Sequence, residues 1–117
     1  MDKRIYKRWN LVKPLKIFDR ESKKYLGELK DITIKGIGIR SELPLKLQLI
    51  VKLKIDLSGE DVEFKNLEIQ GQCVWCQRKL TNLYFSGIKF EDLRVDITKN
   101  IKYLIYRYGF VTQNHSV

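Results

Sequence analysis

Residues 45–58 read Leu45-Lys46-Leu47-Gln48-Leu49-Ile50-Val51-Lys52-Leu53-Lys54-Ile55-Asp56-Leu57-Ser58. Apolar residues occupy every odd position, and polar residues occupy every even position except Ile50. A period of two places alternate side chains on opposite faces of a β-strand. The pattern therefore predicts one long strand over 45–58, with one buried face and one face in water.

Shorter apolar runs on both sides of this segment also have the composition of strands. The predicted strands cover 11–18, 25–34 and 37–41 before it, and 62–78 and 83–90 after it, with a hairpin turn over 58–61. Pro14 places its strand at a sheet edge or marks the point where the strand opens, and Gly27 indicates a bulge. One side of the strand over 62–78 is expected to carry Leu67, Ile69, Gly71, Cys73 and Trp75.

Only the last segment has a helical period, because its apolar residues recur at intervals of three and four. Asp96 is the expected N-cap of this helix and Gly109 its C′ residue. The apolar positions are Ile97, Ile101, Leu104, Ile105 and Tyr108. The short connections between strands require antiparallel pairing, and closure into a barrel removes exposed strand edges. The sequence thus predicts an all-β domain, a six-stranded antiparallel barrel with one C-terminal helix that covers an opening or packs on the flank.

The composition narrows the class of partner. The chain has 117 residues, enough for one domain with its own core, and a formal net charge of +9. A balance this basic favours an anionic partner, such as nucleic acid, a nucleotide or membrane headgroups. No signal-peptide pattern and no apolar run of transmembrane length occur, so we expect a cytoplasmic protein.

The residues that usually carry catalysis or bind metals are sparse. Cys73 and Cys76 form one Cys-x-x-Cys, and His115, the only histidine, lies in the C-terminal tail. A zinc site needs a second pair of ligands, and residues three apart in a strand are expected to point to opposite faces. We therefore expect two structural cysteines, no metal, no cofactor and no enzyme activity.

Two polar clusters remain as candidates for a binding site. Arg4 and Arg8 frame the N-terminal stretch Arg4-Ile-Tyr-Lys-Arg8, and the second cluster is Asp31-x-Thr33-x-x-Gly36 at a turn between strands. Taken alone, the first is either a solvated tail or a clamp that orders on an anion. Taken alone, the second is a common turn pattern, because Asp and Thr cap turns and Gly permits positive φ.

Together, in this order and at this separation, the two clusters resemble the motifs of the PilZ domain family of bacterial cyclic di-GMP receptors. The motifs of that family are Arg-x-x-x-Arg, then Asp/Asn-x-Ser-x-x-Gly, and Thr33 stands here where Ser is usual. Val74-Trp75 and the run from Phe85 to Phe90 look like a later hairpin of the family, although Val and Trp are adjacent here. The resemblance implies residues 1–10 as a flexible ligand-binding switch segment, 11–110 as the barrel with its helix, and 111–117 as a tail.

The resemblance also implies a ligand and roles for individual residues. Arg4 and Arg8 would hold guanine or phosphate of cyclic di-GMP, because the planar guanidinium forms bidentate hydrogen bonds and stacks on purines. Asp31 would accept from guanine N1–H and N2–H₂, Thr33 would offer a hydroxyl, and Gly36 would allow close approach of the ligand. Trp75 is either a flat wall for guanine or a core residue.

Ordering of the N-terminal segment on the ligand would present a new surface to a downstream protein, and the resemblance implies a component of motility or exopolysaccharide control. The site can hold one ligand or an intercalated pair. Two other functions remain open: a basic β-barrel that binds nucleic acid, and a degenerate PilZ-like module that only contacts proteins. Salt-sensitive binding to single-stranded nucleic acid would favour the first.

Overall fold

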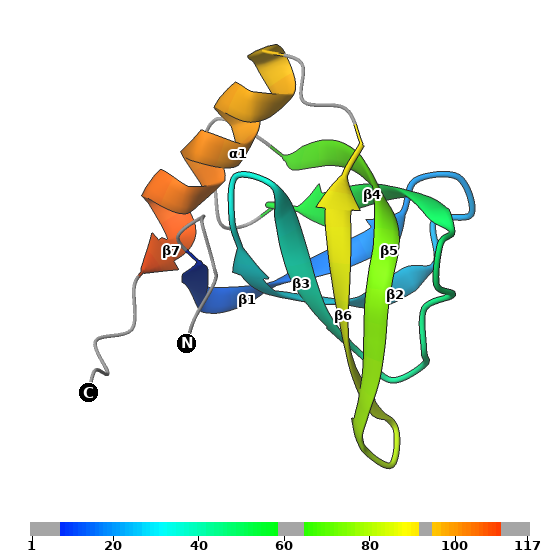
Figure 1. The fold of residues 1–117 in the computed structure, drawn as a ribbon. Coiled ribbons are helices and arrows are strands. Elements are labelled where there is room, and N and C mark those ends of the chain that lie inside the picture. Colours follow the sequence, from blue (N-terminus) through cyan, green and yellow to red (C-terminus); the bar gives the residue numbers. More distant parts are fainter. Residues whose placement is uncertain (1–7, 59–64, 92–94, 111–117) are drawn as a thin grey trace.

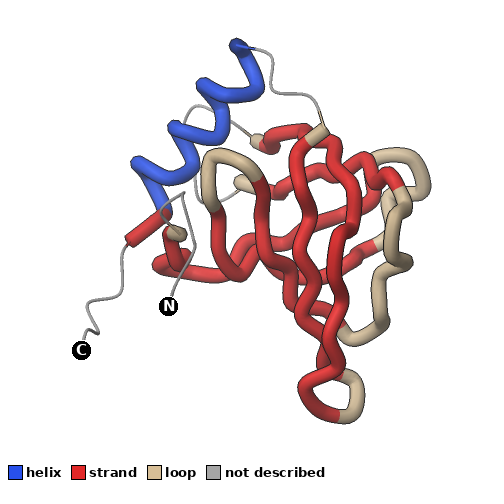
Figure 2. The backbone as a smooth tube through the Cα atoms, in the orientation of Figure 1, coloured by secondary structure: helices blue, strands red, loops and turns tan. Residues whose placement is uncertain are grey.

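The computed structural model describes residues 8–58, 65–91 and 95–110. Arg4, the turn residues 59–61 and the tail 111–117 therefore lie outside the described residues. Strands make up most of the described residues and one helix packs against them (Figures 1 and 2). The elements in order are β1 (Trp9–Asp19), β2 (Tyr25–Ile32), β3 (Gly36–Ser41), β4 (Ile50–Asp56), β5 (Asn66–Leu80), β6 (Leu83–Phe90), α1 (Val95–Tyr108) and β7 (Gly109–Phe110).

The strands close into an antiparallel barrel. Their order is β2-β3-β6-β5-β4-β1, and an additional β1–β2 pairing joins the two ends of this series. The two-residue strand β7 extends the sheet beside β1, where Asn10 pairs with Phe110. Closure gives each of the six long strands a partner on both sides, which satisfies backbone groups that an open sheet would expose. The predicted six-stranded barrel with one helix is confirmed, with β7 as a short addition.

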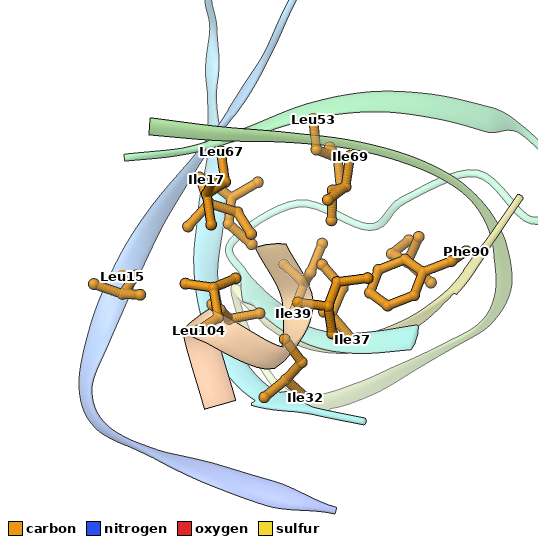
Figure 3. Packing of buried hydrophobic residues seen from close by; sticks show 14 of the residues in the cluster. Leu15, Ile17, Ile32, Ile37, Ile39, Leu53, Leu67, Ile69, Phe90 and Leu104 are labelled. Atoms are coloured by element: carbon orange, nitrogen blue, oxygen red, sulfur yellow. The ribbon is translucent and has the colours of Figure 1, made fainter. Parts of the chain in front are cut away.

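The core lies inside the barrel and reaches the helix. Inward residues from every long strand form one cluster, and Ile101 and Leu104 of α1 join it with 1% of their surface exposed. Figure 3 shows Leu104 among Leu15, Ile17 and Ile39. The helix therefore packs its apolar face onto the barrel core, and each fully buried aliphatic side chain contributes about 1.5–3 kcal/mol.

The strand predicted over 45–58 is shorter in the structure. Its alternation holds where Val51, Leu53, Ile55 and Leu57 are buried. Before Ile50 the chain is not extended, because Gln48 has a φ of 69°. Leu47 and Leu49 consequently lie on the surface, with 56% and 49% of their area exposed, whereas Leu45 is partly buried against the core cluster. The prediction of one buried face over the whole segment is therefore wrong at Leu47 and Leu49.

The predicted helix ends also differ in detail. The helix begins at Val95, so Asp96 lies in its first turn and is not the N-cap. Gly109 opens β7 instead of ending the helix in a left-handed conformation. Gly27 does mark a bulge, because the pairing of β1 with β2 shifts by one residue between Gly27 and Tyr25. Pro14 lies inside β1, which has partners on both sides, so the prediction of a sheet edge or of a strand that opens at this residue is wrong. It lies instead where the β1–β2 register is interrupted between Asn10 and Leu15, a position that suits a residue without an N–H donor.

Candidate functional site

Four residues on four neighbouring strands lie in one row across the outer face of the barrel. Asp31 of β2 pairs with Gly38 of β3, Gly38 pairs with Gly87 of β6, and Gly87 pairs with Trp75 of β5. A Cβ placed on Gly38 would overlap the Asp31 carboxylate, and one placed on Gly87 would overlap the Trp75 indole. The two side chains therefore lean over a floor of bare backbone, which any larger residue at either glycine would fill.

Two bulges turn these side chains outward. In β2 the register shifts between Leu29 and Asp31, and in β5 it shifts between Cys73 and Trp75. Leu29 and Cys73 both face the core, so strict alternation would send Asp31 and Trp75 into the core as well. The extra residue in each strand reverses the side on which the next residue lies. Trp75 is consequently 45% exposed and is not a core residue.

The bulge in β5 also changes the positions of the cysteines. The regular strand pattern places Cys73 and Cys76 on opposite faces, but Cys73 is fully buried and Cys76 packs against the same core cluster. Both thiols are free, and burial raises the pKa of Cys73. No group of three or more metal-binding side chains occurs among the described residues.

Two cations hold the Asp31 carboxylate. Lys30 Nζ donates to Asp31 Oδ2 at 3.2 Å, and Arg8 Nε lies 3.9 Å from the same oxygen. The side chain of Asp31 is 10% exposed, whereas that of Arg8 is 44% exposed. A carboxylate this buried needs partners, because removing an ionised group from water is costly. Arg8, which directly precedes β1, is thus already placed at Asp31.

Thr33 and Gly36 shape the β2–β3 turn. The Thr33 hydroxyl accepts from the backbone N–H groups of Lys35 and Gly36, at 3.0 and 3.1 Å, and donates to the Gly36 carbonyl at 3.4 Å. The Thr33 N–H also donates to the Gly36 carbonyl, at 2.8 Å. A Cβ on Gly36 would overlap the Ile88 carbonyl of β6, so this glycine is needed for close strand approach and does not adopt positive φ. Both residues therefore have a structural task in addition to the predicted binding role.

A cavity of about 540 Å³ lies over the row of four residues. It brings together five of the six predicted site residues: Arg8, Asp31, Thr33, Gly36 and Trp75. Arg4 lies outside the described residues. Among the described residues, the charged side chains in the lining are four cations and one carboxylate, namely Arg8, Lys30, Lys35, Lys89 and Asp31. The cavity therefore favours an anion that carries a group able to hydrogen-bond to Asp31.

The sequence did not identify four further residues of this surface: Lys30, Gly38, Phe85 and Gly87, all in the cavity lining. For the glycines a signal was present, since a glycine inside a strand often marks the close approach of another group. No comparable signal marked Lys30 or Phe85, because lysine and phenylalanine are common on half-exposed strands.

Comparison with known proteins places the chain in a family. The model of the PilZ domain family matches residues 2–107, which is most of the sequence, so the chain belongs to the PilZ domain family. A comparison with curated proteins gave no match. The described residues also contain no helix long and apolar enough to cross a membrane.

Solved structures with the same fold include several of this family. The PilZ domain of YcgR from Escherichia coli with c-di-GMP is 14% identical, with a TM-score of 0.72 and 90% of each chain covered. The K. pneumonia MrkH–c-di-GMP complex is 14% identical, with a TM-score of 0.70 and coverage of 91% of this chain and 52% of that chain. The Bacillus subtilis inhibitor of motility MotI/DgrA is 15% identical, with a TM-score of 0.67 and coverage of 92% and 51%. The chain thus spans about half the length of the last two proteins.

Proposed function

We propose that this chain is a receptor for cyclic di-GMP, which binds in the cavity between Arg8 and Trp75. The observation that carries the proposal is the row Asp31–Gly38–Gly87–Trp75, in which a carboxylate and an indole flank a floor without side chains. Family membership supports the same ligand, as do the similar structures of YcgR and MrkH, both of which are complexes with c-di-GMP.

Each end of the row suits one part of a guanine nucleotide. The Asp31 carboxylate is an acceptor pair for guanine N1–H and N2–H₂, and adenine lacks this pair of donors. The exposed Trp75 ring offers an apolar surface on which a purine can stack, a contact typically worth about 1–3 kcal/mol per base. The cations of the lining favour the two phosphates of the ligand.

Arg8 and Arg4 form the second half of the proposed site. Arg8 lies within ion-pair distance of Asp31. When a guanine of the ligand hydrogen-bonds to the Asp31 carboxylate, the guanidinium can turn to bind guanine or phosphate. Arg4 precedes Arg8 by four residues and would reach the same ligand from the N-terminal segment. The contacts that both arginines gain with the ligand would then offset the entropy lost when the segment before Arg8 becomes ordered.

Ordering of this segment is the proposed output of the receptor. A surface that is fixed only with ligand bound would select a downstream protein, in the manner of an order–disorder switch. A motility or exopolysaccharide component is the proposed partner, in keeping with the structural similarity to the inhibitor of motility MotI/DgrA. Chemical shifts of residues 2–8 that stay unchanged at saturating ligand would contradict this relay.

The ligand is tested by calorimetric titration of the wild-type chain with cyclic di-GMP, cyclic di-AMP and GMP. We expect cyclic di-GMP to bind most tightly, and cyclic di-AMP to bind at least tenfold more weakly, because it leaves the buried Asp31 carboxylate without its guanine donors. Equal affinity for the two cyclic dinucleotides would contradict guanine recognition. Stronger binding to single-stranded poly(U) than to cyclic di-GMP would point to a nucleic-acid-binding barrel instead.

A further inference from the structure

We propose that Lys30, Arg40 and Lys79 form a phosphate-binding subsite around the ring of Phe85, beside the cavity described above. The phosphate is either one of the two in the bound cyclic dinucleotide or a separate phosphate anion. The first of these sources rests on the proposed function. The subsite itself stands on the geometry of these four residues.

Three cations from three strands converge on one aromatic ring. Lys30 Nζ of β2 lies 5.0 Å from the centroid of the Phe85 ring, Lys79 Nζ of β5 lies 5.3 Å from it, and Arg40 Cζ of β3 lies 6.0 Å from it. Phe85 itself is on β6, directly opposite Arg40. All three positive groups therefore lie within cation–π distance of one ring.

Nearby carboxylates compensate this charge only in part. Glu28, which is partly buried, lies 3.7 Å from the exposed Arg40, and Asp31 is already shared between Lys30 and Arg8. For Lys79, no carboxylate among the described residues lies within ion-pairing distance. Cations gathered this closely repel one another, and an anion among them would remove that repulsion.

The cluster of cations around Phe85 lies next to the cavity. Lys30 Nζ is 3.2 Å from Asp31 Oδ2 and 5.0 Å from the Phe85 centroid, so the carboxylate and the ring centroid lie within about 8 Å of each other. Lys30 and Phe85 both line the cavity, whereas Lys79 and Arg40 lie beyond its edge. A nucleotide whose base reaches Asp31 can therefore place a phosphate at the cluster. Ammonium and guanidinium donors are the groups that bind phosphate oxygens in proteins.

A second cation–π pair on the barrel provides a matched control. Lys54 Nζ lies 5.9 Å from the centroid of Phe18, away from the cavity lining. Among the described residues this pair has a single cation. The pKa of the nearby Asp56 is lowered mainly by hydrogen bonds from Ser58, and the charge of Lys54 contributes less. Lys54→Ala therefore removes the same charge and the same kind of ring contact as Lys79→Ala, without touching the proposed subsite.

The first arm of the test measures cyclic di-GMP affinity by calorimetry at two salt concentrations. We expect Lys79→Ala to weaken binding about tenfold and to reduce its dependence on salt, because one phosphate contact is lost. Phe85→Leu should weaken binding to a similar extent, since the ring that positions the cations is gone. Lys54→Ala should bind as the wild type does. Equal affinity and equal salt dependence for Lys79→Ala and Lys54→Ala would overturn the assignment of the nucleotide phosphate to this cluster.

The second arm uses sodium pyrophosphate and follows the ring and amide resonances of Phe85. Shifts in the wild type that are lost in Lys79→Ala, but retained in Lys54→Ala, would establish a phosphate site that does not require the nucleotide. If the wild type binds pyrophosphate in this way but not cyclic di-GMP, the proposed function fails and the subsite stands. If neither pyrophosphate nor cyclic di-GMP shifts the Phe85 resonances, the inference is overturned.

Discussion

The indole of Trp75 lies directly over the Cα of Gly87, so that a Cβ on Gly87 would overlap Trp75 Nε1. The two residues are paired across β5 and β6, and a bulge at Val74 turns the indole out of the barrel. The same arrangement recurs at the other end of the row, where the Asp31 carboxylate lies over Gly38. The two glycines thus fix both the depth of the cavity and the positions of the side chains that flank it.

This contact predicts the effect of Gly87→Ala. The added methyl group must displace the Trp75 indole, which is 45% exposed and can move into solvent. We expect the free energy of unfolding to change by less than about 1 kcal/mol, while cyclic di-GMP affinity falls at least tenfold. The indole N–H resonance of Trp75 should shift in the free protein. Unchanged affinity in a variant with a shifted indole would show that Trp75 does not contact the ligand.

Gly36→Ala, unlike Gly87→Ala, is expected to lower the stability of the fold. Its Cβ would overlap the backbone carbonyl of Ile88, and backbone atoms cannot move aside as a side chain can. We predict a loss of about 2 kcal/mol or more in the free energy of unfolding, measured by urea denaturation, because β3 must separate from β6. A variant as stable as Gly87→Ala would contradict this explanation of the glycine.

The two cysteines should differ in reactivity. Cys73 is fully buried and its pKa is raised by burial, so little thiolate is present near neutral pH and reagents cannot reach it. We expect iodoacetamide at pH 8 to modify Cys76 first and Cys73 only when urea unfolds the chain, as followed by mass spectrometry. Equal rates of modification in the folded protein would contradict the inward position of Cys73.

Asp19 makes stability depend on pH. Its Oδ1 accepts from the N–H groups of Glu21 and Ser22, both at 2.8 Å, and the bond from Ser22 is the main reason that its pKa is lowered. A carboxyl group whose pKa is lower in the folded state stabilises the fold above its unfolded value of about 3.9, and this contribution is lost as the pH falls through the folded value.

Asp19→Ala should therefore lower the free energy of unfolding by about 1 kcal/mol at pH 7, with a smaller difference at acid pH. Urea denaturation at pH 7 and at about pH 2 measures both values. Glu42→Ala, which removes an exposed carboxylate from another loop, serves as the control. A loss for Asp19→Ala that is the same at both pH values would contradict an ionic origin of the effect.

The alternation of apolar residues was sufficient to predict most of the fold. Leu53, Ile55, Leu67 and Ile69 face the core as their period of two requires. The pattern failed where the backbone departs from a regular strand. Gln48 has positive φ, which neither its residue type nor its neighbours indicate, so the pattern places the exposed Leu47 on a buried face.

The candidate site was predicted only in part, for a related reason. Arg8, Asp31, Thr33, Gly36 and Trp75 were predicted through a family resemblance, and all five line one cavity. The bulges that turn Asp31 and Trp75 outward result from strand register, which depends on residues far apart in the sequence. The positions of Lys30 and Phe85 beside Asp31 depend on the same register and could not be inferred from local sequence.

Calorimetric titration of cyclic di-GMP into the wild type, Arg8→Ala and a charge-matched control tests the central claim most directly. The control is Arg107→Ala, in the last turn of α1 and outside the cavity lining. We predict that the wild type and Arg107→Ala bind with the same affinity and stoichiometry, and that Arg8→Ala binds at least tenfold more weakly, because charge-assisted hydrogen bonds from its guanidinium are lost. Equal affinity for all three proteins, or the absence of binding by the folded wild type, would contradict the proposed receptor site.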